Sequence, residues 1–273
     1  MAVNSINSNV GAMVALQNLN ETSRALGVTQ NRVNTGKSVS SAKDNGAIFA
    51  IATGMRADMG ALNSVRNSIE RGKSVIDVAL AAGDTISKAL EEQKALAVAI
   101  QSVPDTSASA IAYLADYNAL GVEITAALGA ATFDSVNLFS VSSPANSLVV
   151  QTGLNSTQTV HSNVAGTTPA TTLADVTGTK TYAQATVANV NLAMTAFNTK
   201  MAAIGSASKS LDRQATFVSK LQDALESGVG NLVDADLAKE SARLTALQTK
   251  QQLGVQALGI ANQSSSILLG LFR

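Results

Sequence analysis

The feature of this sequence that most constrains its fold is a seven-residue spacing of apolar residues over long stretches. Between residues 187 and 232, one position of the repeat is always apolar, and a companion position is apolar in the first half. The first position holds Val190, Phe197, Ile204, Leu211, Val218, Leu225 and Leu232, and the companion holds Val187, Met194 and Met201. A strict seven-residue repeat keeps one seam of a helix facing a partner helix along its whole length. The pattern therefore predicts a long helix packed as in a coiled coil.

A second long helix is predicted earlier in the chain. Its repeat positions, each seven residues apart, are Met55, Leu62, Ile69, Ile76, Gly83 and Leu90. Pro104 is expected to end it, and a further helix with Ile111 and Ile124 on its apolar stripe should end near Gly129. After the last long repeat, Gly228 and Gly230 are expected to interrupt the helix, and the apolar stripe resumes out of phase beyond them. This break predicts a joint between two helical domains.

Both ends of the chain lack charge: no Asp, Glu, Lys or Arg occurs from Ala2 to Asn20 or from Gln251 to Phe272. Apolar residues still recur there at helical spacing. A surface helix normally carries charge on its solvent face, so these end helices are expected to pack against other copies of the chain. The predicted subunit-packing residues are Ile6, Val10, Met13, Leu16, Leu19, Leu26, Val33, Leu237, Leu244, Leu247, Val255, Leu258, Leu268, Leu271 and Phe272.

The segments between the helices are shorter. Residues 34–37 have loop composition, and Ser41 with Asp44 is expected to form a capping box at a helix start. Residues 133–181 are rich in Ser and Thr and contain short β-favouring runs, which predicts a small exposed insertion, open to O-linked modification or simply a polar loop. The predicted fold is mainly α, with long antiparallel heptad helices, a terminal coiled-coil pair and this β/loop insertion. Its three parts are 1–40 with 234–273, 41–132 with 182–233, and 133–181.

Composition argues against several functions. The net charge is zero and no basic block is present, which excludes an electrostatic nucleic-acid surface. No apolar run approaches the roughly 20 residues that span a bilayer, so membrane insertion is not expected. One histidine (His161) and no cysteine leave no zinc-ligand spacing and no histidine triad, so neither metal nor cofactor is expected. The rival enzyme reading, a Ser–Lys hydrolase, rests on Ser40-x-x-Lys43 and Ser206-x-x-Lys209, which lack that class's accompanying motifs. A non-enzymatic, self-assembling protein is the preferred interpretation.

Several motifs together resemble the bacterial flagellins over essentially the whole chain. Near the start these are Leu16-Gln-Asn-Leu-Asn20, Val33-Asn-Thr-Gly-Lys37, Ser41-Ala-Lys-Asp-Asn-Gly46 and Ala50-Ile-Ala52. Later ones are Val150-Gln-Thr-Gly-Leu-Asn155, Val233-Asp-Ala-Asp236, Gln251-Gln-Leu-Gly254, Ala261-Asn-Gln263 and Leu268-Leu-Gly-Leu-Phe-Arg273. The termini look closest to short alphaproteobacterial flagellins.

The resemblance implies a filament subunit for swimming motility. The terminal helices would form an inner tube around a channel, the long helices an outer tube, and residues 133–181 a reduced surface domain. Subunits of this family leave the cell through a flagellar type III export apparatus without a cleaved signal peptide. Implied partners are further copies of the chain, hook-associated junction and cap proteins, and an export chaperone on the C-terminal helix. The alternative within the same structural class is a hook–filament junction protein.

One segment departs from the family pattern. Many flagellins carry Leu-Gln-Arg-Val-Arg-Glu-Leu on the long helix, which Toll-like receptor 5 recognises. The matching stretch here is Leu90-Glu-Glu-Gln-Lys-Ala-Leu96, with Glu92 at the first arginine position and Ala95 at the glutamate position. Recognition by that receptor is therefore not expected.

Overall fold

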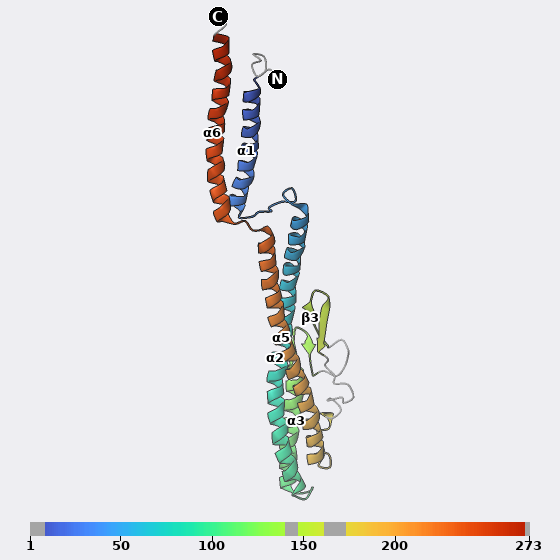
Figure 1. Ribbon diagram of the computed structural model, residues 1–273. Helices are drawn as coiled ribbons and strands as arrows, with labels where there is room; N and C mark the ends of the chain where they lie inside the picture. The colour runs from blue at the N-terminus through green and yellow to red at the C-terminus, as the bar shows by residue number, and fades with distance from the viewer. Residues whose placement is uncertain (1–8, 140–146, 161–172, 271–273) are drawn as a thin grey trace. The chain divides into compact units, whose positions relative to one another are not determined.

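A computed structural model describes residues 9–139, 147–160 and 173–270, without the side chains of 264–270. The described chain consists mainly of long helices, as the heptad patterns predicted (Figure 1). The helices are α1 (Val10–Thr35), α2 (Gly46–Gln101), α3 (Ala108–Ala130), α5 (Val187–Val233) and α6 (Leu237–Gly270). The strands are β1 (Thr132–Phe133), β2 (Val136–Asn137), β3 (Leu148–Gly153) and β4 (Ser156–Val160), paired as two antiparallel hairpins.

The chain divides into two compact units. One unit comprises residues 1–57 with 224–273, and the other comprises residues 58–223. The three-part division expected from the sequence stays a prediction.

In the unit 58–223, the predicted heptad positions form the contact between α2 and α5. The repeat residues of α2 from Leu62 to Leu90 are buried, as are those of α5 from Val190 to Val218. Two polar contacts fix the antiparallel register of the two helices: the ammonium of Lys73 pairs with the carboxylate of Asp212, and Gln222 Nε2 donates to Asn63 Oδ1 at 2.9 Å. The hydrogen bond that Lys73 donates to Asp212 also raises the pKa of Lys73.

Helix α3 adds a third layer to this core through a buried amide. Gln93 Nε2 donates to the carbonyls of Tyr117 and Val176, both at 3.0 Å, and so joins α2 to α3 and to the segment before α5. Gly121 leaves room for that segment, because a Cβ there would lie 2.8 Å from the Val176 carbonyl oxygen. The stripe expected on α3 holds at Ile124, which is buried, but fails at Ile111, which is 64% exposed near the helix start.

The β3–β4 hairpin is seated on the helices by a glycine. A Cβ on Gly72 of α2 would lie 2.5 Å from Val150 Cγ2, so only a glycine lets this strand approach so closely. Beside it, the Gln151 N–H donates to Ser68 Oγ at 3.0 Å. The part of the predicted insertion that the structure describes is therefore packed against the helical bundle.

Two local predictions are wrong. Helix α5 is not interrupted at Gly228 and Gly230 but continues to Val233. These glycines admit close neighbours instead: a Cβ on Gly228 would lie 2.9 Å from Met55 Cε, and one on Gly230 would lie 3.0 Å from Asp234 Oδ2.

The capping box predicted at Ser41 and Asp44 is also replaced by another arrangement. Asp44 Oδ2 accepts from the hydroxyls and backbone N–H groups of Ser40 and Ser41, which lowers the pKa of its carboxyl, chiefly through the Ser40 hydroxyl. The cap of α2 is Asn45, whose Oδ1 accepts from the Ile48 N–H at 3.2 Å. The carboxylate therefore closes a turn that precedes the helix.

Candidate subunit-packing surface on the terminal helix pair

Helices α1 and α6 form an antiparallel pair whose register is fixed at both ends. Asn9 Nδ2 donates to the Ala261 carbonyl at 2.7 Å at one end. At the other end, Arg32 meets Glu240. Between them, the Leu19 side chain lies over Gly254, where a Cβ would stand 3.2 Å from Leu19 Cδ1.

The seam of this pair is made largely of small and polar residues. On α1, the residues turned toward α6 recur every three or four positions, and two of them are threonines that are only 5% and 2% exposed, Thr22 and Thr29. The α1 seam is Ala12, Ala15, Leu19, Thr22, Leu26, Thr29 and Val33, and the α6 seam is Glu240, Leu244, Leu247, Gln251, Gly254, Leu258 and Ala261. The short side chains let the two helix axes approach closely, and the five leucines and one valine supply the apolar part of the seam.

Capping groups define where these helices begin and end. Asn9 Oδ1 accepts from the Ala12 N–H at 3.0 Å, and Asp236 Oδ1 accepts from the N–H groups of Ala238 and Lys239, so each helix start has a side-chain acceptor. Helix α1 ends at Gly36, whose φ of 69° is the left-handed conformation that glycine adopts without strain. The connecting segments are joined by backbone bonds, including Ser38 N–H to the Val233 carbonyl at 2.7 Å.

The seam contains one ion pair. The Arg32 guanidinium donates to Glu240 Oε1 at 3.1 Å, and the Glu240 side chain is 11% exposed. The second carboxylate oxygen, Oε2, is buried and has no hydrogen-bond partner among the described residues. A single charged pair in a seam of uncharged residues favours one register over shifted ones.

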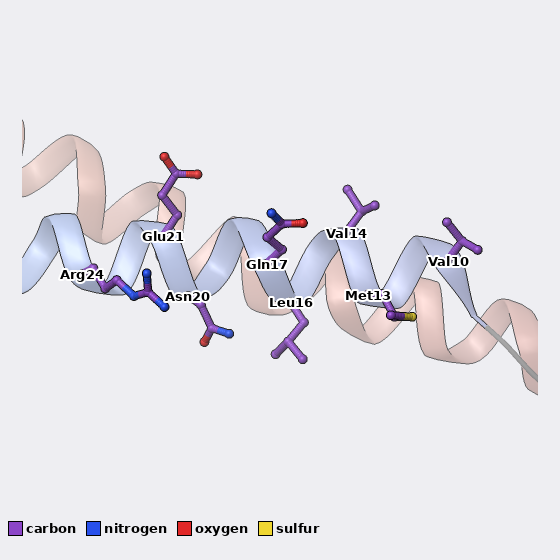
Figure 2. Close-up of a pocket in the computed structure, with 8 residues that line it drawn as sticks. All are labelled: Val10, Met13, Val14, Leu16, Gln17, Asn20, Glu21 and Arg24. Atoms are coloured by element: carbon purple, nitrogen blue, oxygen red, sulfur yellow. The ribbon is translucent and has the colours of Figure 1, made fainter.

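Large apolar side chains lie outside this seam. Figure 2 shows two rows of side chains along α1, with α6 behind it: Val10, Val14, Gln17 and Glu21 on one side, and Met13, Leu16, Asn20 and Arg24 on the other. Met13 is 67% exposed and Val10 is 61% exposed. On α6, Leu253, Val255 and Ile260 are also more than half exposed. The charge-free end of the unit thus presents apolar side chains to its surroundings.

The predicted packing residues fall into three groups. Half-buried in the α1–α6 seam are Leu19, Leu26, Val33, Leu244, Leu247 and Leu258. Exposed outside it are Val10, Met13, Leu16, Leu237 and Val255. Outside the described residues lie Ile6, Leu271 and Phe272, as does His161 of the insertion, and the side chain of Leu268 is not described either.

The sequence interpretation missed the small members of the seam. It treated the apolar residues of α1 as one stripe, whereas the structure separates seam residues from exposed ones. The sequence did contain a signal for the seam. Val33, Leu26 and Leu19 are each seven residues apart, and the next position of this repeat is Ala12, not Met13. Alanine and threonine carry too little hydrophobicity for that register to stand out beside Val10, Met13 and Leu16.

A cluster of metal ligands and a membrane-spanning helix are both absent from the described residues. That part of the chain contains no group of three or more acidic or histidine side chains arranged to hold a metal ion. None of its helices is both long and apolar enough to cross a membrane.

Comparisons with known proteins agree with this architecture. Residues 6–143 match the model of the bacterial flagellin N-terminal helical region, and residues 187–272 match that of the C-terminal helical region. Flagellin FljM of Caulobacter vibrioides is 47% identical, and flagellin FljK of the same organism is 46% identical, each over 100% of both chains. A flagellin of Brucella melitensis is 36% identical over 98% of this chain and 99% of its own length. Two matched helical regions, joined in the order in which the structure places α1 to α3 and then α5 and α6, identify this chain as a member of the bacterial flagellin family.

Proposed function

We propose that this flagellin polymerises into the flagellar filament through the exposed apolar faces of α1 and α6, which neighbouring copies cover. The observation that carries the proposal is the position of Met13 and Val10, which are 67% and 61% exposed on an uncharged helix. Both residues lie outside the α1–α6 seam, so these side chains have no partner surface within it. A second copy of the chain supplies one.

The energetic argument supports this role. Fully burying a Met, Val or Leu side chain is worth about 1.5–3 kcal/mol. Since Met13, Val10 and Leu16 are about half to two-thirds exposed, each stands to contribute roughly 1 kcal/mol when a neighbour covers it. Summed over several residues on two helices, that gain drives association, whereas the pair alone gains little from its narrow seam.

The finer assignments belong to the same proposal. The filament lies outside the cell, and the subunit reaches it through flagellar type III export without signal-peptide cleavage. Hook-associated junction and cap proteins bind the two ends of the polymer. A cytosolic chaperone covers the C-terminal helix before export, and the exposed Leu253, Val255 and Ile260 of α6 suit such a partner. The role is structural and non-enzymatic, in keeping with the family. No feature favours the junction-protein alternative, and the relatives named above are flagellins.

The test replaces exposed apolar residues without disturbing the seam. Met13→Gln combined with Leu16→Gln in the full chain keeps α1 helical, because both positions lie outside its contact with α6. Filament formation from seeds is followed by sedimentation and electron microscopy. Because 1.4 kcal/mol is a factor of ten, losing ~2 kcal/mol should raise the critical concentration about 30-fold.

The matched control is Leu154→Gln, which removes an apolar side chain of 41% exposure from the β3–β4 turn of the other unit. It should assemble as the parent chain does. Unchanged critical concentration in the Met13/Leu16 variant, with the helical circular dichroism signal retained, would contradict the proposal.

A further inference from the structure

A second surface of the molecule, in the unit 58–223, is a shallow, open groove between two helices. Helices α2 and α3 run antiparallel here, and the groove, of about 500 Å³, is lined by Glu92, Ala95, Leu96, Asp116, Ala119 and Leu120. Both helices contribute the same pattern, an acid followed three and four residues later by Ala and Leu. The two leucines are half-buried, and the two alanines and the two acids are exposed.

The two carboxylates lie toward opposite ends of this groove. The Gln93 amide donates to the Tyr117 carbonyl and lies close to Gly121. Residue 93 of α2 is therefore level with the helical turn of α3 that lies between Tyr117 and Gly121. From the helix rise of 1.5 Å per residue, Glu92 and Asp116 are then about 6 Å apart along the helix axes. Two further acids, Glu91 and Glu123, and two lysines, Lys88 and Lys94, lie close by in sequence, so the surroundings are acidic on balance.

A complementary surface lies on α5. Phe217 is 58% exposed, although an aromatic ring of its size gains much from burial. Arg213 stands four residues before it and Lys220 three residues after it, which puts both exposed cations on the same face of the helix as the ring. The cations are about 10 Å apart along the helix, and their long side chains can reach inward to two acids whose positions are about 6 Å apart along their helices.

Within one molecule, the α5 surface around Phe217 cannot reach the α2–α3 groove. The Lys73–Asp212 and Gln222–Asn63 contacts place Phe217 level with residue 68 of α2. Glu92 lies 24 residues further along the same continuous helix, which corresponds to about 36 Å. Two different, complementary patches this far apart on one subunit form a head-to-tail contact, and head-to-tail contacts build filaments when the rotation between successive copies does not close a ring.

We propose that Phe217 of one copy inserts into the α2–α3 groove of the next, with Arg213 and Lys220 facing Glu92 and Asp116. This contact rests on the proposed polymerisation and deepens it. It assigns to the unit 58–223 an interface separate from the terminal helices. The aromatic ring supplies apolar burial, and the two charge pairs set its direction and register.

Charge reversal and rescue test the electrostatic half of the contact. In the full chain, Glu92→Lys with Asp116→Lys, or Arg213→Glu with Lys220→Glu, should each raise the critical concentration for filament growth at least tenfold. The variant with all four substitutions restores the pairs in the opposite sense and should return to within about threefold of the parent chain. Assembly of either two-substitution variant like the parent, or an unrescued four-substitution variant, overturns the proposal.

Cross-linking tests proximity without requiring a heavily altered chain. The sequence contains no cysteine, so Phe217→Cys and Ala119→Cys each introduce a unique thiol. The two single variants are mixed as minor fractions with the parent chain, grown into filaments and treated with a short bismaleimide. A covalent dimer is expected from the mixture and from neither variant alone.

The matched control mixes Leu154→Cys with Ala119→Cys and should give no dimer. If parent filaments form but the Phe217/Ala119 mixture yields no more dimer than this control, the α5-to-groove contact is wrong and polymerisation stands. If the parent chain itself forms no filaments from seeds, the proposed function has failed instead.

Discussion

The guanidinium of Arg32 lies 3.1 Å from the carboxylate of Glu240, and this pair joins the last turn of α1 to the first turn of α6. The backbone bonds between residues 36–39 and 233–236 lie next to it in sequence. The pair therefore holds the seam at its closed end, where the two helices are connected to the rest of their unit.

Replacing one partner of this pair should cost more than replacing both. Glu240→Leu leaves the Arg32 guanidinium, which is 33% exposed, without its carboxylate, and should lower the free energy of unfolding by about 1–3 kcal/mol. Arg32→Leu combined with Glu240→Leu should recover most of that loss, because no buried charge is left unpaired. Urea unfolding, followed by circular dichroism, measures the unfolding free energy of the single and of the double variant. A double variant less stable than Glu240→Leu would contradict this account.

Two glycines of α2 should respond oppositely to the same substitution. Gly60→Ala meets no atom within 4 Å and should stabilise the helix by up to ~1 kcal/mol. Gly72→Ala drives its Cβ to 2.5 Å from Val150 Cγ2 and should destabilise the unit by about 1–3 kcal/mol despite the better helix propensity. Thermal unfolding compares the two variants. Adding Val150→Ala should relieve the Gly72→Ala variant, and a Gly72→Ala chain as stable as Gly60→Ala would refute the close approach of β3.

Lys200 should make stability depend on pH. It is 1% exposed, and burial lowers its pKa to about 8 from an ordinary value of 10.5. Between these values the unfolded chain binds a proton that the folded chain does not, so the free energy of unfolding rises with pH in that window. The shift corresponds to roughly 3 kcal/mol at most. Urea unfolding at pH 7.5, 8.5 and 9.5 should show the rise, and this range avoids Tyr117, whose pKa burial raises to about 12.

The matched variant for that experiment is Lys200→Met, which keeps the length of the side chain without its ammonium. Its unfolding free energy should be nearly constant over the same pH range. A slope equal to that of the parent chain would assign the effect to another group.

Removal of residues 251–273 should separate assembly from folding. The truncation deletes Gly254, Leu258 and Ala261 from the seam and uncovers the start of α1, so filament formation should be lost. The unit 58–223 lies outside the deleted segment and should keep its helical circular dichroism signal and cooperative melting. Filaments of normal length from the truncated chain would disprove the role of the terminal pair.

The sequence predicted the long helices well because their seams are built from large apolar residues at a strict spacing. Positions such as Ile69 and Phe197 can face only a partner helix, and both are buried. The prediction failed where the missing Cβ of a glycine lets another residue approach the helix closely. Gly228 was expected to break a helix, whereas it sits inside α5 against Met55. Helix propensity cannot reveal that a neighbouring side chain occupies the space of the missing Cβ.

The sequence predicted only part of the candidate packing surface, because apolar residues alone do not show which face of α1 contacts α6. The list of apolar residues on α1 combined Leu19, which faces α6, with Met13, which does not. Separating them requires knowing which face α6 covers, and on that face Leu19, Leu26 and Val33 alternate with Ala and Thr, which do not stand out as hydrophobic. Buried threonines such as Thr22 bond their own helix, here to the Asn18 carbonyl at 2.8 Å, so they enter a seam without an external partner.

The alanines, threonines and glycine of the α1–α6 seam have a thermodynamic consequence. Such side chains have few rotamers to lose, so fixing them between the helices carries a small entropic cost, but it also releases less water from apolar surface than larger side chains would. In the filament that we propose, neighbours covering Val10 and Met13 would supply further apolar burial. Growth of such a polymer would then complete, at this end, the burial that folding of the single chain leaves unfinished.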